Sequence, residues 1–240
     1  MSSFEEWRRK NPSKSFKDFF AERTEKKLRK GKAHASLGSN LLYNLVYGTS
    51  GKKYFQRFVK AGLKPQDACV DYGCGTLRVG IHAINYLDVG SYWGLDISDY
   101  LLEEGRKLIG DDLWKAKRPN LRVISAEAVA EAAAAKPAML FSSKVLIHVH
   151  PDELAEYVGN VMTIIGATGE AIITGKWSDR ETMRYSSQSW VHRLATVEDL
   201  VKARGGKVEV LADHESKLEQ VGHTAKTGTL RIISISGAYS

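Results

Sequence analysis

From residue 64 onward, short apolar runs alternate with amphipathic segments, and this alternation constrains the fold more than any other feature of the chain. Apolar runs of about four to eight residues are typical of buried strands, whereas apolar positions three and four apart indicate helices. Successive strand–helix units favour a parallel sheet with helices on both faces. The predicted strands cover residues 68–72, 91–95, 121–125, 138–142 and 169–174, and the helices between them residues 77–87, 100–109, 126–135 and 152–165.

The chain closes with a different pattern. A further helix is predicted to begin at Thr196, with Asp199 three residues later as a variant of the capping box. Two strands, at 207–211 and 229–236, follow with no helix evident between them, so this pair can be antiparallel. The predicted fold class is therefore α/β: a doubly wound, seven-stranded, mostly parallel sheet whose last strand is antiparallel.

The first 60 residues lack the alternation. Residues 3–30 are predicted to be helical, with Pro12 separating two short helices because its ring and missing N–H disfavour a helix interior. Residues 39–60 are predicted to form further helix, interrupted at Gly48 and Gly51. We expect two parts, an N-terminal helical extension or lid (residues 1–60) and an α/β domain (residues 61–240).

The positive charge of the chain is concentrated at its N-terminus. The net charge is +7, and residues 1–32 hold eleven Lys/Arg against five Asp/Glu, which leaves about +1 for the rest. A basic segment suggests an acidic partner such as nucleic acid, while a solvated helix face is the commoner explanation of such a run. Nucleic acid is therefore an open but disfavoured partner.

Composition excludes several other classes of protein. The chain has 240 residues, 43% of them hydrophobic, which suffices for a sizeable core. Its two cysteines, Cys69 and Cys74, lack zinc spacing and favour a reducing cytoplasm over a disulfide framework. No apolar run approaches the roughly 20 residues of a membrane span, and residues 1–10 lack the apolar stretch of a signal peptide. We expect a soluble, cytoplasmic protein without a metal site.

A glycine loop stands where the first predicted strand meets its helix. The segment Val-Asp-Tyr-Gly-Cys-Gly-Thr (residues 70–76) lets the backbone turn tightly and approach a ligand closely. The N-terminus of the following helix adds unpaired N–H groups. Asp96 ends the second strand about 20 residues later, where a carboxylate can accept hydrogen bonds from both ribose hydroxyls. Together these features predict a ligand that contains a nucleoside.

Two residues distinguish between nucleoside cofactors. A dinucleotide fingerprint would require a third glycine at position 78, which is Arg78 in this chain. The carboxylate of Asp71 would be an unfavourable neighbour for a phosphate, and it suits a cofactor with a cationic end. NAD is thereby disfavoured without being excluded.

These segments resemble a known family. Val-Asp-Tyr-Gly-Cys-Gly-Thr-Leu (residues 70–77) is similar to motif I of the class I S-adenosylmethionine-dependent methyltransferases, and Gly-Leu-Asp-Ile-Ser (residues 94–98) resembles their second motif. Residues 141–149 resemble the fourth-strand segment of their small-molecule members. The resemblance covers about residues 65–236, and it implies a Rossmann-like catalytic domain that binds S-adenosyl-L-methionine and inserts its last strand beside the fifth.

Carried over residue by residue, the resemblance implies a cofactor site. Gly73 and Gly75 would pass under the methionine part, Asp71 would lie near its amino group, Asp96 would hold the ribose and Ile97 would pack on adenine. The full set of implied cofactor-binding residues is Asp71, Tyr72, Gly73, Gly75, Leu77, Arg78, Asp96, Ile97, Ala126, Glu127, Ser142 and Ser143.

The resemblance also implies positions for four residues after the third and fourth strands. Ala126 and Glu127 would reach the adenine edge, and Ser142 and Ser143 would line the cleft. The chain departs from the family at Leu77, where a third glycine is common. Arg78 could reach the cofactor carboxylate or point outward.

Residues outside the motifs are candidates for the acceptor side. His148 follows the fourth strand and could act as a general base, since its ordinary pKa is near neutrality; packing beneath the cofactor loop is the alternative. Lys144 could bind an acidic substrate or be an exposed charge. The stretch at 176–195 has no clear periodicity and could form a lid over a substrate. The proposed substrate-binding residues are Tyr43, Tyr47, Lys144, Trp177 and Trp190.

The predicted function is transfer of a methyl group from S-adenosylmethionine to an O or N atom of a small molecule, such as a sugar or secondary metabolite. The alternatives are an RNA or protein methyltransferase that uses the basic N-terminus, and a non-catalytic module that binds cofactor or a partner. No Asn/Asp-Pro-Pro-Tyr/Phe tetrapeptide follows the fourth strand, which disfavours methylation of base amines. The sequence leaves open whether the chain forms a homodimer.

Overall fold

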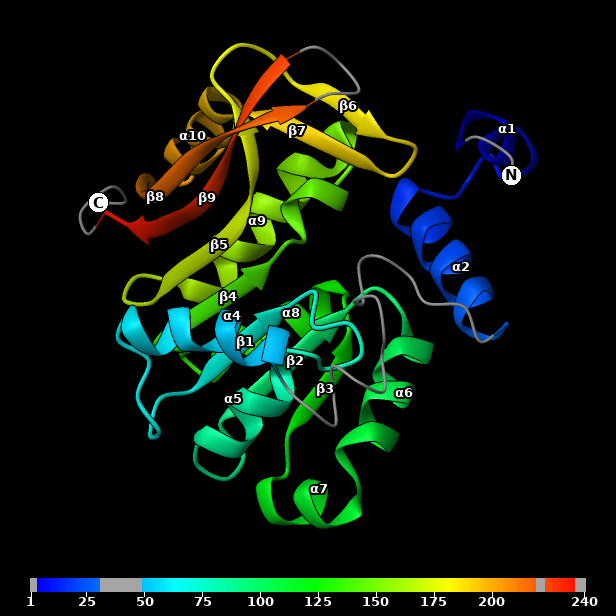
Figure 1. The fold of residues 1–240 in the computed structure, drawn as a ribbon. Helices are drawn as coiled ribbons and strands as arrows, with labels where there is room; N and C mark the ends of the chain where they lie inside the picture. Colours follow the sequence, from blue (N-terminus) through cyan, green and yellow to red (C-terminus); the bar gives the residue numbers. More distant parts are fainter. Residues whose placement is uncertain (1–3, 31–48, 219–222, 236–240) are drawn as a thin grey trace.

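The computed structural model describes residues 4–30, 49–218 and 223–235. These residues form one mixed sheet flanked by helices (Figure 1). The strands are β1 (Cys69–Tyr72), β2 (Tyr92–Asp96), β3 (Asn120–Val123), β4 (Met139–Ser143), β5 (Glu170–Ser178), β6 (Met183–Ser186), β7 (Ser189–Arg193), β8 (Gly206–Leu218) and β9 (His223–Ser234).

The helices fall between these strands and before them. They are α1 (Phe4–Lys10), α2 (Phe16–Leu28), α4 (Thr49–Lys60), α5 (Gly80–Tyr86), α6 (Asp99–Ile109), α7 (Asp111–Lys117), α8 (Ala126–Ala134), α9 (Leu154–Ile165) and α10 (Leu194–Lys202). Two short 3₁₀ turns, η2 (Leu146–His148) and η3 (Pro151–Glu153), connect β4 to α9. Within the described residues, no helix combines the length and the apolar character needed to cross a membrane.

The predicted parallel core and the final strand pair are present, but the described residues form nine strands instead of the predicted seven, because β6 and β7 are added. Its parallel strands lie in the order β3-β2-β1-β4-β5, and β9 runs antiparallel to β5 and pairs with β8 on its other side. The chain therefore winds outward from β1 in one direction and from β4 in the other, which creates a switch point between them. The predicted α/β class and the antiparallel last strand beside the fifth are confirmed.

Side chains alternate between the two faces of this sheet, as strand geometry requires. Val70 and Leu140 point into the core beneath α8, α9 and α10, whereas Cys69 and Phe141 point into the core beneath α4 and α5. Phe58 of α4 stacks on Phe141 with ring centroids 4.3 Å apart. Helix α4 thus covers one face of the sheet, while the proposed boundary at residue 60 stays a prediction.

Several local predictions were wrong. Residues 183–193 form the β6–β7 hairpin, which extends the sheet from the end of β5, rather than an irregular segment. Helix α10 begins at Leu194, so Thr196 lies inside the helix, and its N-cap Arg193 makes no side-chain capping bond. Gly51 lies within α4 and does not interrupt it. A Cβ on Gly51 would lie 2.0 Å from the carbonyl oxygen of Arg78, so the glycine serves close packing.

The N-terminal helices form a separate aromatic cluster. Helices α1 and α2 are separated at Pro12 as predicted, and Ser15 caps α2 in a capping box with Asp18. Their buried rings pack with Trp190 of β7, and the Phe16 and Trp190 rings meet edge-on with centroids 4.6 Å apart. These two helices, drawn in blue in Figure 1, stand apart from those that cover the sheet.

Leu77 occupies a backbone conformation that glycine adopts readily. Its φ is +61°, in the left-handed region, and its side chain is completely buried. The side chain fills the space beside Gly80 and Gly105, where an added Cβ would lie within 3.0 Å of Leu77 carbons. Burial of this side chain offsets the roughly 1 kcal/mol that the left-handed backbone costs.

We therefore expect Leu77→Ala to lower the free energy of unfolding by about 2–4 kcal/mol, because the substitution leaves a cavity and keeps the left-handed strain. Urea unfolding measures this loss. Leu211→Ala, at a side chain that is 48% exposed, is the matched control and should change stability by less than about 0.5 kcal/mol. Equal effects of the two substitutions would contradict this role of Leu77.

Candidate functional site

A cavity of about 890 Å³, including its open mouth, lies at the carboxyl ends of β1, β2 and β4. This is the edge of an open parallel sheet at which ligands bind, and the cavity lies beside the switch point between β1 and β4. Its lining residues come from the strand ends, from α9 and from α2: Lys17, Phe20, Tyr72, Gly73, Gly75, Asp96, Ile97, Leu101, Ile124, Ser143, Lys144, Val145, His148, Val149, Glu153, Glu156, Tyr157 and Asn160.

The glycine loop forms one wall of the cavity. Gly73 and Gly75 have φ values of +83° and +55°, and the backbone N–H groups of Gly73 and Cys74 both donate to the carbonyl of Leu95. A Cβ on Gly73 would lie 2.3 Å from Val145 Cγ2, so a larger residue would displace the segment after β4. The loop therefore needs glycine for its backbone conformation and for this contact.

Asp96 fixes the loop to the end of β2. Its Oδ2 accepts a hydrogen bond from Gly75 N at 2.8 Å, and its Oδ1 accepts one from Ser98 N at 3.1 Å. The carboxyl is 6% exposed and lines the cavity. Burial raises the pKa of Asp96 to about 6, against the lowering effect of the backbone N–H donors. A carboxylate offers about four lone-pair sites, so Asp96 can still accept a hydrogen bond from a hydroxyl group of a ligand.

Asp71 lies under the loop rather than in the cavity wall. It points to the α5 side of the sheet, is 2% exposed, and its Oδ2 accepts a hydrogen bond from the Tyr92 hydroxyl at 2.9 Å. Burial raises the pKa of Asp71 to about 8, opposed by the Tyr92 hydrogen bond and reinforced by the nearby charge of Asp96. The predicted contact with a cofactor amino group stays a prediction.

The other implied cofactor residues fall into two groups. Tyr72, Ile97 and Ser143 line the cavity. Leu77 and Arg78 do not line it. Leu77 is buried in the core, and the guanidinium of Arg78 lies 5.4 Å from the centre of the Tyr54 ring.

Ser142 lies behind the wall. It donates to the carbonyl of Tyr72 at 3.0 Å and accepts from the Tyr157 hydroxyl at 2.9 Å. Ala126 and Glu127 are exposed at the start of α8 and do not line the cavity.

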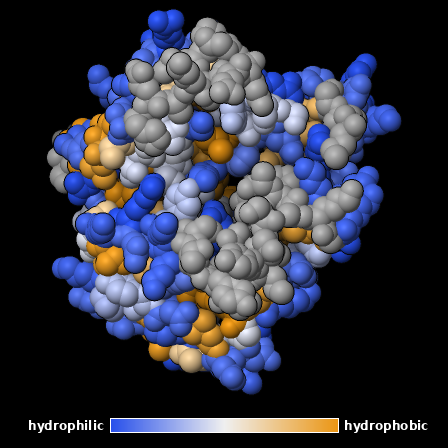
Figure 2. Space-filling view, in the orientation of Figure 1, coloured by the Kyte–Doolittle hydropathy of each residue, from blue (hydrophilic) through white to orange (hydrophobic). Residues whose placement is uncertain are grey.

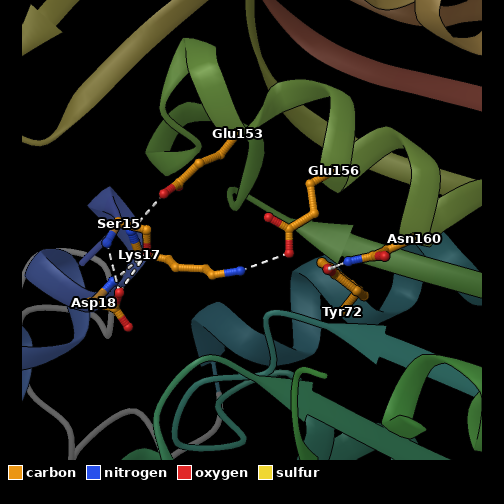
Figure 3. A network of polar contacts seen from close by, with 7 residues as sticks. All are labelled: Ser15, Lys17, Asp18, Tyr72, Glu153, Glu156 and Asn160. Atoms are coloured by element: carbon orange, nitrogen blue, oxygen red, sulfur yellow. Dashed lines mark hydrogen bonds and ion pairs between the residues drawn. The ribbon is translucent and has the colours of Figure 1, made fainter. Parts of the chain in front are cut away.

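Helix α2 contributes cavity residues that the sequence did not suggest. Lys17 and Phe20, one helical turn apart, line the cavity. The Lys17 ammonium lies 2.7 Å from Glu156 Oε1, and the Lys17 backbone N–H donates to Glu153 at 3.1 Å; Figure 3 shows this bridge beside the Tyr72–Asn160 hydrogen bond.

The other end of α2 is attached as well. The Ser98 hydroxyl donates to Glu25 Oε1 at 2.7 Å, two residues after Asp96. Helix α2 is therefore attached to both α9 and the start of α6, on two sides of the cavity. The outer surface of α1 and α2 is mostly hydrophilic (Figure 2).

His148 lines the cavity with a defined tautomer. Its Nδ1 lies 2.9 Å from the carbonyl oxygen of Gln188 and 3.3 Å from Ser189 Oγ. Because a carbonyl can only accept, Nδ1 carries the hydrogen and Nε2 keeps its lone pair. Burial lowers the pKa of His148 below its ordinary value, aided by the positive charge of Lys144, so the ring is neutral at pH 7.

The proposed substrate residues are dispersed. Lys144 lines the cavity, whereas Trp177 is fully buried in the core and Trp190 belongs to the aromatic cluster of α1 and α2. Tyr43 and Tyr47 lie outside the described residues.

Comparison with solved structures shows which fold this is. Magnesium protoporphyrin IX methyltransferase from Synechocystis PCC 6803, solved with bound S-adenosylhomocysteine (SAH), aligns over 91% of this chain and 98% of its own at 14% identity, with a TM-score of 0.57. Phosphoethanolamine N-methyltransferase 2 from Haemonchus contortus aligns over 93% of this chain and 61% of its own at 14% identity, with a TM-score of 0.63.

A third similar structure is 1,6-didemethyltoxoflavin-N1-methyltransferase from Burkholderia thailandensis, which aligns over 77% of this chain and 79% of its own at 16% identity, with a TM-score of 0.51. At these identities the likeness concerns the fold, and the chain has the Rossmann-like fold of methyltransferases. No family model matches the sequence, and no curated protein sequence matches it.

Asp71 gives the stability a pH dependence whose sign follows from its raised pKa. The native carboxyl keeps its proton up to about pH 8, whereas the unfolded one releases it near the ordinary pKa of 3.8. The native state therefore binds the extra proton, and stability falls as the pH rises through this window. Between pH 6.5 and 8, Asp96, with a pKa of about 6, is mostly ionised and adds much less slope than Asp71.

We expect Asp71→Asn to flatten the fall in unfolding free energy between pH 6.5 and 8, since an amide does not ionise but still accepts the Tyr92 hydrogen bond. Urea unfolding at several pH values measures the slope. Asp112→Asn, at an exposed position of α7, should leave it unchanged. Parallel pH profiles for Asp71→Asn and the unsubstituted protein would contradict the raised pKa.

Proposed function

We propose that this protein is an S-adenosyl-L-methionine-dependent methyltransferase that acts on an O or N atom of a small molecule. The observation that carries the proposal is the pairing of the Gly73–Gly75 loop with the buried Asp96 carboxylate in one cavity wall. The topology of the sheet supports it, as do the bound SAH of the Synechocystis and Haemonchus enzymes and the S-adenosylmethionine of a second Synechocystis structure.

The residues of the cavity fit this cofactor. Asp96 offers free lone pairs to two ribose hydroxyls, and Ile97, Leu101 and Ile124 supply apolar surface for the adenine. The glycine backbone lets the methionine part approach β1 closely. When bound, the cofactor would supply a methyl group on a positively charged sulfur, and this sulfur would leave as a neutral thioether as the electron pair of the acceptor atom bonds to the methyl carbon.

The protein contributes position, exclusion of water and a proton acceptor. Helix α2 places Lys17 and Phe20 in the cavity wall, where they reduce the space open to water and favour alignment of the two reactants. A hydroxyl acceptor must lose its proton as its oxygen bonds to the methyl carbon. We assign this proton to Nε2 of His148, whose lone pair is kept available because Nδ1 donates to Gln188. An amine acceptor needs no such base.

Asp96→Asn is expected to weaken the binding of SAH at least tenfold. The substitution removes a charged acceptor of hydrogen bonds, and such bonds contribute about 1.5–3 kcal/mol each. Titration calorimetry at pH 8 measures the affinity, with Asp112→Asn as the matched control on α7. An unchanged affinity in Asp96→Asn would contradict the assigned role of Asp96.

His148→Gln is expected to lower kcat with a hydroxyl acceptor by about 10²–10⁴ while leaving the affinity for SAH within twofold. The rate of the unsubstituted enzyme should fall as the pH drops below the pKa of His148, which lies below the ordinary value of 6.5. This acidic limb should be absent in His148→Gln. The same limb in both proteins would remove His148 as the base.

A further inference from the structure

Two lysines lie near the carboxyl ends of the neighbouring strands β4 and β5, and the first of them lines the cavity. Lys144 directly follows β4 and lines the cavity, and Lys176 is near the end of β5. The two segments are joined, because the backbone N–H of Lys144 donates to the carbonyl of Thr174 at 2.9 Å. Burial lowers the pKa of Lys176, and the positive charge of Lys144 lowers it further. The two ammonium groups therefore repel each other across adjacent strands.

Each ammonium group faces an aromatic ring instead of a carboxylate. Lys144 Nζ lies 5.0 Å from the centre of the Tyr54 ring, and Lys176 Nζ lies 5.1 Å from that of Tyr185. The guanidinium groups of Arg57 and Arg78 approach the same Tyr54 ring at 5.1 and 5.4 Å. Four cationic side chains thus surround two tyrosines, and their combined potential favours an anion.

Neither lysine has an acidic partner among the described residues. Lys226 on the adjacent strand β9 provides the contrast, since its ammonium lies 3.1 Å from Asp179 and 3.5 Å from Asp213. The segment from 31 to 48 contains no Asp or Glu, so it has no carboxylate to supply. Among the residues whose side chains the structure describes, Lys144 and Lys176 therefore have no compensating carboxylate, whereas the neighbouring Lys226 is paired twice.

The backbone at Lys144 adds a second unfavourable contribution. Its φ is +62°, in the left-handed region that costs a non-glycine residue roughly 1 kcal/mol or more. Glycine would adopt this turn without strain. Lys144 therefore combines an unpaired charge near a like charge with local backbone strain. Both features lower the stability of the fold, and features of this kind are common where a protein binds a ligand.

From this arrangement we propose that Lys144 and Lys176 form a subsite for an anionic group, a carboxylate or phosphate, of the methyl acceptor. This inference rests on the proposed function and narrows its substrate class to small acidic molecules. His148 stands four residues after Lys144 on the same cavity wall. An acceptor anchored by its anionic group at the lysines would extend its neutral part toward that histidine.

Inorganic phosphate is the probe that tests the subsite, titrated by calorimetry into protein saturated with SAH at constant ionic strength. We expect phosphate to bind, and we expect Lys144→Gln and Lys176→Gln each to weaken it at least fivefold. Lys144→Arg should retain most of the affinity because it keeps the charge. Lys202→Gln, at an exposed lysine of α10, is the matched control and should match the unsubstituted protein.

Thermal unfolding of the same variants verifies that they fold, and removal of one repelling charge should leave Tm unchanged or raise it. Absence of phosphate binding, or equal affinity in all four variants, would overturn the subsite. Failure of the proposed function is recognised separately. If SAH does not bind while phosphate still binds through the two lysines, the anion subsite stands and the methyltransferase assignment fails.

Discussion

The carboxylate of Asp96 joins three parts of the cavity wall. One oxygen holds the glycine loop through Gly75 N, and the other holds Ser98 N, at the start of α6. The Ser98 hydroxyl continues the connection to Glu25 of α2. A buried carboxylate with few donors would be strongly destabilising, so these N–H groups are what allow an acid at this depth. The same group that would bind a ribose thus also positions the loop and one end of the covering helix.

The remaining polar contacts of the cavity extend this arrangement across the sheet. Tyr72 points to the α9 side, where its hydroxyl accepts from Asn160, while Asp71 points to the α5 side and Tyr92. Adjacent residues of one strand therefore anchor opposite layers of helices. Lys17 then connects α9 to α2 through Glu156. The side chains around the cavity have bonding partners far away in sequence, so the cavity forms only when the whole domain is folded.

The parallel core was predictable from sequence because its signals are local. Apolar runs ending in glycine or a polar residue located every boundary of β1 to β5 to within four residues, and the Gly73–Gly75 loop with Asp96 indicated the nucleoside site. The β6–β7 hairpin was missed because four consecutive residues of β7 are buried, which leaves the strand no polar face and no alternation. Trp190 packs in the N-terminal aromatic cluster, and Val191 packs against Ala225. Lys17 and Glu156 could not be paired in advance, since nothing local in sequence relates residues 139 positions apart.

The proposed methyltransferase function depends most directly on recognition of S-adenosyl-L-methionine by the Gly73–Gly75 loop and Asp96. Titration calorimetry of the full chain with S-adenosyl-L-methionine, with NAD⁺ in a parallel titration, measures this recognition. We expect saturable binding of one S-adenosyl-L-methionine per chain and no binding of NAD⁺. Absence of heat from S-adenosyl-L-methionine at millimolar concentration, or equal binding of NAD⁺, would contradict it.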